Sequence, residues 1–184
     1  MLATEILMSE HRVIERVIAS LKTGARRLEA GQPVRPEFFL NAADFIKGFA
    51  DGCHHKKEEG VLFKALESAG LPVNGGPVGT MLMEHEQGRA FTAGMRQAAL
   101  RLQAGQASAA ADLIANARGY AALLTQHIQK EDTILFPLAD RVLDPQSQND
   151  VAEGFEHVEH EETGEGVHEK YLGIADSLES EMQA

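Results

Sequence analysis

The 184-residue chain has a single cysteine, Cys53, no tryptophan, and few aromatic side chains, which make up 5% of it. A lone cysteine excludes an internal disulfide and fits a reducing compartment, so we expect a cytoplasmic protein. Basic residues are also few: 17 Lys and Arg stand against 28 Asp and Glu, which gives a formal net charge of -11. Nucleic acids and anionic membranes are bound through clustered basic residues, so neither is an expected partner. No apolar run has the length of a membrane span.

Apolar residues recur at helical spacing through most of the chain, and no strand pattern is longer than a few residues. The pattern predicts helices over residues 3–30, 36–69, 80–105 and 108–143, a glycine-rich loop at 70–79 and a further helical segment at 149–182. The short link around Gly105 forces its two helices to be antiparallel neighbours. We therefore expect a single all-α domain, with an up-down four-helix bundle at 1–144 and a C-terminal helical extension, a fifth helix, at 145–184.

The two halves of the predicted bundle carry the same pattern of residues. HHKKEEGVLF at 54–63 aligns with HIQKEDTILF at 127–136, and LMSEH at 7–11 aligns with MLMEH at 81–85. Each half thus contributes one helix with a single inward His and one helix with a His-x-x-x-Glu motif. Two such helical hairpins related by pseudo-symmetry predict a four-helix bundle.

The helical period decides where these polar side chains lie. Residues four apart differ by about 40° around the axis, so His54 shares a face with Glu58, and His127 shares one with Glu131. That face is also the apolar stripe, where an uncompensated carboxylate costs several kcal/mol. A pair of metal ions, held by both carboxylates and by one imidazole from each helix, would compensate the charge. Mixed nitrogen and oxygen ligands suit iron or another first-row metal, whereas calcium and magnesium prefer oxygen alone.

His55 competes with His54 for the role of ligand, because it has the same spacing from Glu59. The Leu-Phe pair that follows each half's glutamate sets the register of the repeat, and this register selects His54 and Glu58. We therefore expect His55 and Glu59 about 100° away, on a more exposed face.

As a set, these residues resemble the hemerythrin-like, or HHE cation-binding, family over about residues 2–143. The pattern that carries the resemblance is His11, His54-x-x-x-Glu58, His85 and His127-x-x-x-Glu131, with Leu-Phe after each Glu. The resemblance implies a non-heme di-iron centre bridged by an oxo or hydroxo group and by Glu58 and Glu131. It also implies that the four histidines are terminal ligands. The C-terminal segment is similar to extensions of bacterial members.

The chain departs from the oxygen-carrying hemerythrins at two points. Those proteins have His-x-x-x-His on the third helix, where Arg89 here stands four residues after His85, and they end with His-x-x-x-x-Asp instead of His-x-x-x-Glu. With about six positions per iron, four His, four carboxylate oxygens and a shared oxygen leave roughly two positions open. An extra open position predicts reaction with dioxygen, peroxide or nitric oxide rather than reversible carriage. Such a reaction also requires an electron donor.

Two further residues are candidates for positions just outside the ligand set. Arg89, one turn beyond His85, would hold an anion or orient a glutamate; the simpler alternative is a surface ion pair. Tyr120, seven residues before His127, would donate to a bound oxygen species; its alternative is a core tyrosine with the hydroxyl at the edge.

The C-terminal segment contains its own His and Glu residues: His157, His160, Glu161, His168 and Glu169. His157 and Glu161 repeat the four-residue spacing, but no matching half exists elsewhere in the chain. We expect a largely solvated helix here, with His168 and Glu169 approaching the open side of the bundle.

The leading interpretation is a cytoplasmic di-iron protein that binds and reduces dioxygen, hydrogen peroxide or nitric oxide, with peroxidase-like, catalase-like or nitric oxide reductase activity. A non-catalytic iron- or oxygen-binding buffer or sensor is the competing interpretation. A manganese or mixed metal pair is the alternative to iron. A metal-free bundle would leave two core carboxylates unexplained.

Overall fold

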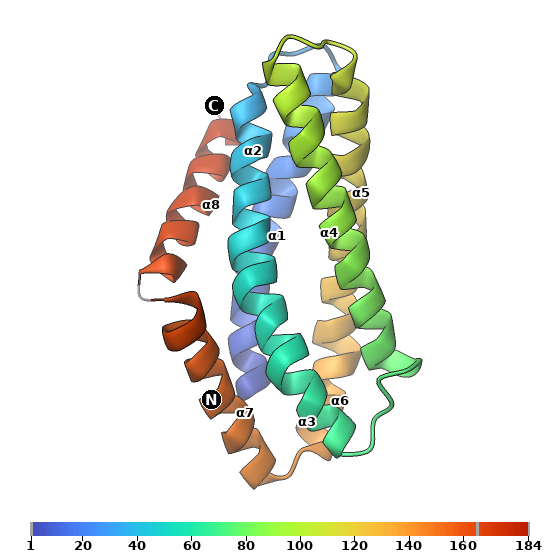
Figure 1. Cartoon of the computed structure of the whole chain (residues 1–184), viewed down its shortest axis with the longest axis vertical. Helices are drawn as coiled ribbons and strands as arrows, with labels where there is room; N and C mark the ends of the chain where they lie inside the picture. The colour runs from blue at the N-terminus through green and yellow to red at the C-terminus, as the bar shows by residue number, and fades with distance from the viewer. Residues whose placement is uncertain (1, 165, 184) are drawn as a thin grey trace.

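The computed structural model describes residues 2–164 and 166–183, and within these ranges all regular structure is helical. Four helical rods lie side by side and alternate in direction (Figure 1). They are α1 (Ala3–Glu29); a second rod of α2 (Pro36–Phe45), η1 (Ile46–His55), η2 (Glu58–Leu62) and α3 (Phe63–Ser68); α4 (Gly76–Gln103); and a fourth rod of α5 (Ala109–Lys130), η3 (Glu131–Leu135) and α6 (Phe136–Val142). The predicted all-α bundle is confirmed. None of the described helices is both long and apolar enough to cross a membrane.

The loop between the second and third rods is shorter than the glycine pattern predicted. It was expected at residues 70–79, but α4 already begins at Gly76. Gly75 and Gly76 have φ angles of 80° and 67°, a region that glycine enters without strain. A Cβ at Gly79 would lie 2.6 Å from the carbonyl oxygen of Val73, so this glycine lets the loop fold closely over the first helical turn.

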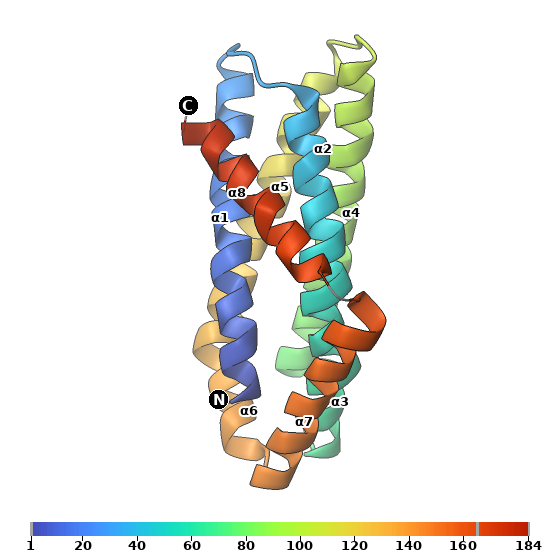
Figure 2. The same ribbon diagram turned by 90° about the vertical axis from the view of Figure 1, so that its left-hand side faces the viewer.

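The segment after the bundle forms two helices, so the predicted single fifth helix is wrong. α7 (Pro145–His157) continues into the π-helical η4 (Val158–Thr163), and α8 (Val167–Gln183) follows. The helix ends at Gly164, which has a φ of 97°. α7 lies against α1 and η2, and α8 crosses α1 and α2 obliquely (Figure 2). A Cβ at Gly48 would collide with the hydroxyl of Tyr171, so the close crossing of α8 requires a glycine there.

Buried apolar side chains form two clusters, one on each side of a polar layer. On α1, Leu7 belongs to one cluster and Ile14 to the other, and His11 lies between them. On the fourth rod, Ile128 belongs to the same cluster as Ile14 and Leu135 to the same cluster as Leu7, and Glu131 lies between them in the sequence. The bundle therefore holds a layer of titratable side chains between two apolar cores.

Candidate metal centre

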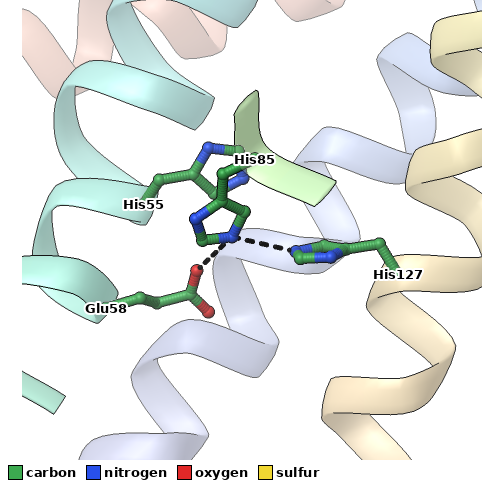
Figure 3. Close-up of side chains that lie close together, drawn as sticks. All are labelled: His55, Glu58, His85 and His127. Carbon is green, nitrogen blue, oxygen red and sulfur yellow. Dashed lines mark hydrogen bonds and ion pairs between the residues drawn. The ribbon is translucent and has the colours of Figure 1, made fainter. Parts of the chain in front are cut away.

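The polar layer brings together seven side chains that can bind a metal ion, contributed by all four rods. They form two groups. The first consists of His11, His54, Glu58 and Glu131, and the second, which Figure 3 shows, consists of His55, Glu58, His85 and His127. Within each group, one donor atom per residue lies within 4.8 Å of the others. Every one of these residues is at most 4% exposed. Because Glu58 belongs to both groups, the two groups form one continuous centre.

All six residues predicted as ligands lie in this layer, and His55 joins them. The expectation that His55 occupies a more exposed face is wrong: it is 4% exposed, and its ring stacks on that of His85 at 3.8 Å between centroids. The reason is the backbone of η1, which is π-helical. Its wider turn rotates successive side chains through a smaller angle than an α-helix does, so both His54 and His55 point into the bundle.

The backbone repeats along with the sequence, except at His55. The π-helical segments η2 and η3 begin at Glu58 and Glu131, the matching glutamates of the two halves. η1 has no counterpart, because α5 stays α-helical as far as Lys130. Ile128 occupies the position that corresponds to His55, and it belongs to an apolar cluster. His55 is therefore the donor that breaks the pseudo-symmetry.

Each histidine of the layer has its Nδ1 atom within 3.3 Å of a carboxylate oxygen. The pairs are His11 with Asp132 (2.7 Å), His54 with Glu10 (2.8 Å), His55 with Asp51 (3.3 Å), His85 with Glu59 (2.7 Å) and His127 with Glu84 (3.0 Å). An Nδ1–H that donates to a carboxylate fixes the tautomer and leaves the Nε2 lone pair for a metal. The imidazoles are thus oriented as metal ligands.

A lysine or arginine compensates each of these carboxylates. The pairs are Asp132 with Arg12, Glu10 with Lys57 (2.5 Å), Asp51 with Arg89 (2.8 Å), Glu59 with Arg89 (2.6 Å) and Glu84 with Lys130. Arg89 contacts two of these carboxylates and, at the surface, Glu86, which fits both the predicted orientation of a glutamate and its alternative, a surface ion pair. The sequence pattern did not predict this role for the carboxylates, although four of the five are direct neighbours of a predicted ligand: Glu10 of His11, Glu59 of Glu58, Glu84 of His85 and Asp132 of Glu131.

The inward atoms of the layer show that it fits cations. Both carboxylate oxygens of Glu58 and of Glu131 are buried without a hydrogen-bond partner among the described residues, as is Nε2 of His11. The Nε2 atoms of His85 and His127 lie 3.1 Å apart. With each Nδ1–H already donated, two neutral rings would place lone pairs face to face here, so this contact needs a cation between them: a proton in the metal-free chain, or a metal ion. A metal ion in the layer would satisfy the carboxylates and take the place of that proton.

Electrostatic interactions in the metal-free chain also favour positive charge in the layer. Burial acts to lower the pKa of His11, but the carboxylates of Asp132 and Glu131 outweigh it and raise the value to about 9. Burial is likewise outweighed at His127, where Glu131 helps to raise the pKa to about 10. Burial and the neighbouring His85 lower the pKa of His55 well below its ordinary value. The layer therefore takes up positive charge, which protons supply when no metal does.

Comparison with known proteins agrees with this geometry. Residues 2–139 match the hemerythrin HHE cation binding domain, a region that includes all seven donors. The chain belongs to this family. Relatives that are 28% identical over 180 residues, covering 98% of this chain and 70% of theirs, occur in Mycobacterium bovis and in two strains of Mycobacterium tuberculosis; all are described as uncharacterized. No solved structure matches the chain.

Tyr120 of this HHE domain lines a pocket beside the second group of donors. Its side chain is 1% exposed, and its hydroxyl has no hydrogen-bond partner in the described part of the chain. With His55 and His85 it lines a cavity of about 320 Å³. Burial, with a smaller effect of Asp51, raises the pKa of Tyr120, so the hydroxyl keeps its proton and remains a donor. The hydroxyl thus lies inside the bundle and not at its edge.

The C-terminal histidines lie away from the seven donors. The side chains of His157 and His160 are more than half exposed, and Glu169 is exposed as well. His168 is half-buried, with its ring 5.2 Å from that of Phe49 and its Nδ1 3.6 Å from a carboxylate oxygen of Glu159. These polar side chains are thus largely solvated, whereas the apolar face of the segment, with Phe155 and Leu178, is buried in the two cores. Of the two residues expected to approach the bundle, His168 does so.

One cluster near His168 has the composition of a metal site but already contains a cation. Glu10, Glu159 and His168 offer donor atoms within 4.8 Å of one another. The ammonium of Lys57, which is 0% exposed, lies 2.5 Å from Glu10 and 2.8 Å from Glu159. Lys57 thus supplies the positive charge and joins the C-terminal segment to the carboxylate that orients His54.

Proposed function

We propose that this HHE domain holds a non-heme di-iron centre that binds and reduces small oxidants, namely dioxygen, hydrogen peroxide or nitric oxide. The observation that carries the proposal is the position of the two glutamates between the two groups of histidines. Glu58 belongs to both groups, and the same oxygen of Glu131 lies 3.2 Å from Nε2 of His11 in one group and of His127 in the other. Carboxylates so placed would bridge two metal ions.

The donor set supports iron as the metal. Five imidazoles and two carboxylates form a mixed nitrogen and oxygen set, which suits first-row transition metals better than calcium or magnesium. A manganese or mixed pair is the alternative. When bound, the metal pair would supply the electrons for reduction, while the chain fixes its geometry and limits the access of water.

His55 gives specific support to a second candidate function. The sequence left roughly two open positions at the metal pair, but a fifth imidazole reduces this to about one. A single open position suffices to bind one small ligand. The prediction of reaction rather than reversible binding rested on a second open position, so it loses support. The second candidate is accordingly a non-catalytic iron- or oxygen-binding buffer or sensor.

Metal content tests the centre. Protein produced with iron available should hold two metal ions per chain, and Glu58→Ala and His127→Ala should lose at least one. His160→Ala removes an exposed imidazole and is the matched control, with wild-type content expected. Wild-type content in Glu58→Ala would refute the shared site.

Kinetics then separate the two functions. The reduced, metal-loaded protein is mixed with hydrogen peroxide or nitric oxide in a stopped-flow instrument, with an excess of chemical reductant. Repeated turnover supports reduction of the oxidant. Consumption of one equivalent per centre, followed by no further reaction, contradicts it and supports the buffer or sensor.

The proposal includes a cytoplasmic location, where reducing conditions would keep the centre supplied with electrons. It is supported by the single cysteine, Cys53, which is free and 3% exposed. Burial raises the pKa of the Cys53 thiol, so the residue is a packing element and not a redox group.

A further inference from the structure

A pocket between η1 and α4 connects the metal layer with the surface. The buried part of its wall includes His55 and His85, two donors of the second group, together with Tyr120. Its rim includes exposed residues of the same elements, such as Lys47 and Ala93. A ligand in this pocket would therefore lie directly beside the second group of metal donors.

The pocket is much larger than the oxidants of the proposed function. Its volume is about 320 Å³, whereas a water molecule occupies roughly 30 Å³ of liquid. A volume of this order is typical of sites that bind small organic molecules. Of the three proposed oxidants, hydrogen peroxide has organic derivatives, the hydroperoxides R–OOH, in which the reactive O–O bond is kept and the R group could fill the pocket. Ala43, Ile46 and Gly88 supply apolar wall for such an R group.

The charged side chains that line the pocket are paired, apart from Lys47 at the solvent-exposed rim, which favours a neutral ligand. Arg89 binds Asp51 at 2.8 Å and also contacts Glu59 and Glu86. Arg96, at the rim, pairs with an aspartate, and Lys47 is exposed to water. The buried part of the wall therefore offers no unpaired charge to a ligand. It does offer one unpaired donor, the buried hydroxyl of Tyr120.

We propose that this pocket binds neutral organic hydroperoxides, with the R group against the apolar wall and a peroxide oxygen accepting a hydrogen bond from Tyr120. The inference rests on the proposed function, because it names a substrate class for the same centre. In the reduction, R–OOH takes up two electrons and two protons, the O–O bond breaks, and R–OH and water form. The metal pair, when bound and reduced, would supply the two electrons, and solvent would supply the two protons.

Binding is tested without turnover. Cumyl alcohol, the product of cumene hydroperoxide reduction, is titrated into protein loaded with zinc, which is redox-inert, and binding is followed by saturation-transfer NMR. We expect saturable binding to the wild type. Tyr120→Phe removes only the hydroxyl and should weaken the affinity about threefold to tenfold, the effect of one hydrogen bond.

Two phenylalanine substitutions on α4 locate the site. Ala93→Phe introduces bulk at an exposed position that lines the pocket, whereas Ala90→Phe introduces the same bulk at an exposed position that does not. Ala93→Phe should abolish binding of cumyl alcohol, and Ala90→Phe should bind it like the wild type. No binding to the wild type, or equal binding to Ala93→Phe, would overturn the inference.

The reaction of the reduced wild type with hydrogen peroxide tests the proposed function separately. Consumption of hydrogen peroxide without any binding of cumyl alcohol refutes the organic substrate class alone. Binding that depends on Ala93, without consumption of any peroxide, supports the pocket as a binding site and refutes the reduction.

Discussion

At the scale of the residue, each imidazole of the layer is the inner member of a chain of contacts. His85 is an example: its Nδ1 lies 2.7 Å from Glu59, whose carboxylate lies 2.6 Å from Arg89, while its Nε2 lies 3.3 Å from Glu58. Glu58 and Glu59 are adjacent in the sequence and have the same side chain. Glu58 points into the layer, whereas Glu59 contacts the Nδ1 atom of His85, on the side of the ring away from Glu58. They therefore form a matched pair for substitution.

Glu58→Gln should abolish binding of at least one metal ion, because a neutral amide no longer compensates two cations. Glu59→Gln should keep both ions but lower the affinity by about 10- to 100-fold, the usual effect of losing a carboxylate behind a ligating histidine. Anaerobic titration with ferrous iron measures both the stoichiometry and the affinity. Equal effects of the two substitutions would contradict the different roles assigned to them.

His55→Ala should also lower the stoichiometry or the affinity for iron, because His55 is a donor of the second group. The matched control is His160→Ala, whose side chain is 63% exposed and should be dispensable. The same anaerobic titration measures the effect. Unchanged binding in His55→Ala would mean that its buried ring only packs against His85, and the centre would then have the six donors expected from the sequence.

At the scale of the element, the π-helical segments are the part of the backbone that apolar periodicity does not predict. The four rods, their antiparallel order and the inward His-x-x-x-Glu faces follow from apolar periodicity and an internal repeat, which are properties of the sequence itself. The place of His55 does not follow, because it depends on a backbone that departs from the α-helical period over η1. The break near Gly164 was also missed, since isolated glycines within a helical pattern do not reveal which of them takes a positive φ.

The elements of the C-terminal extension are joined to the centre through Lys57. This residue of the second rod is fully buried between Glu10 of α1 and Glu159 of η4. The two carboxylates outweigh burial and raise the pKa of Lys57, so the ammonium stays charged. The contacts run from Glu159 through Lys57 and Glu10 to the imidazole of His54. The C-terminal extension therefore helps to position a predicted metal ligand.

Lys57→Met should lower the free energy of unfolding by about 3 kcal/mol, because it leaves the buried carboxylate of Glu10 without its cation. Lys56→Met, at the exposed neighbouring position, should change it by less than about 0.5 kcal/mol. Urea unfolding of the metal-free proteins, followed by circular dichroism, provides both values. Equal stability of the two variants would show that the buried ion pair is not needed. A weaker affinity of Lys57→Met for iron is expected as well, through the lost support of His54.

At the scale of the whole molecule, a charged layer lies between two apolar cores, so the stability of the fold depends on the charge that the layer holds. Without metal, protons on His11 and His127 offset the carboxylates, and the neighbouring carboxylates raise their pKa values to about 9 and 10 against the effect of burial. With metal, cations take the place of those protons. The same layer should thus give two different dependences of stability on pH.

The metal-free protein should lose stability as the pH rises from about 6.5 to about 10. An ordinary histidine has a pKa of 6.5, so between that value and the raised values of His11 and His127 the folded chain holds protons that the unfolded chain has released. The contribution is complete below pH 6.5 and disappears as the pH passes the folded pKa values. His55 acts in the opposite sense: burial and His85 lower its pKa, so it disfavours the folded state below pH 6.5.

The metal-loaded protein should lack the decline above pH 6.5, because its imidazoles are already unprotonated, and it should lose metal in acid as protons compete for the ligands. Urea unfolding at pH 6.5, 8 and 9.5, on chelator-stripped and on loaded protein, measures both dependences. His157→Ala and His160→Ala alter exposed imidazoles and should leave the decline unchanged. A stripped protein that is as stable at pH 9.5 as at pH 6.5 would contradict the view that protons replace the metal in this layer.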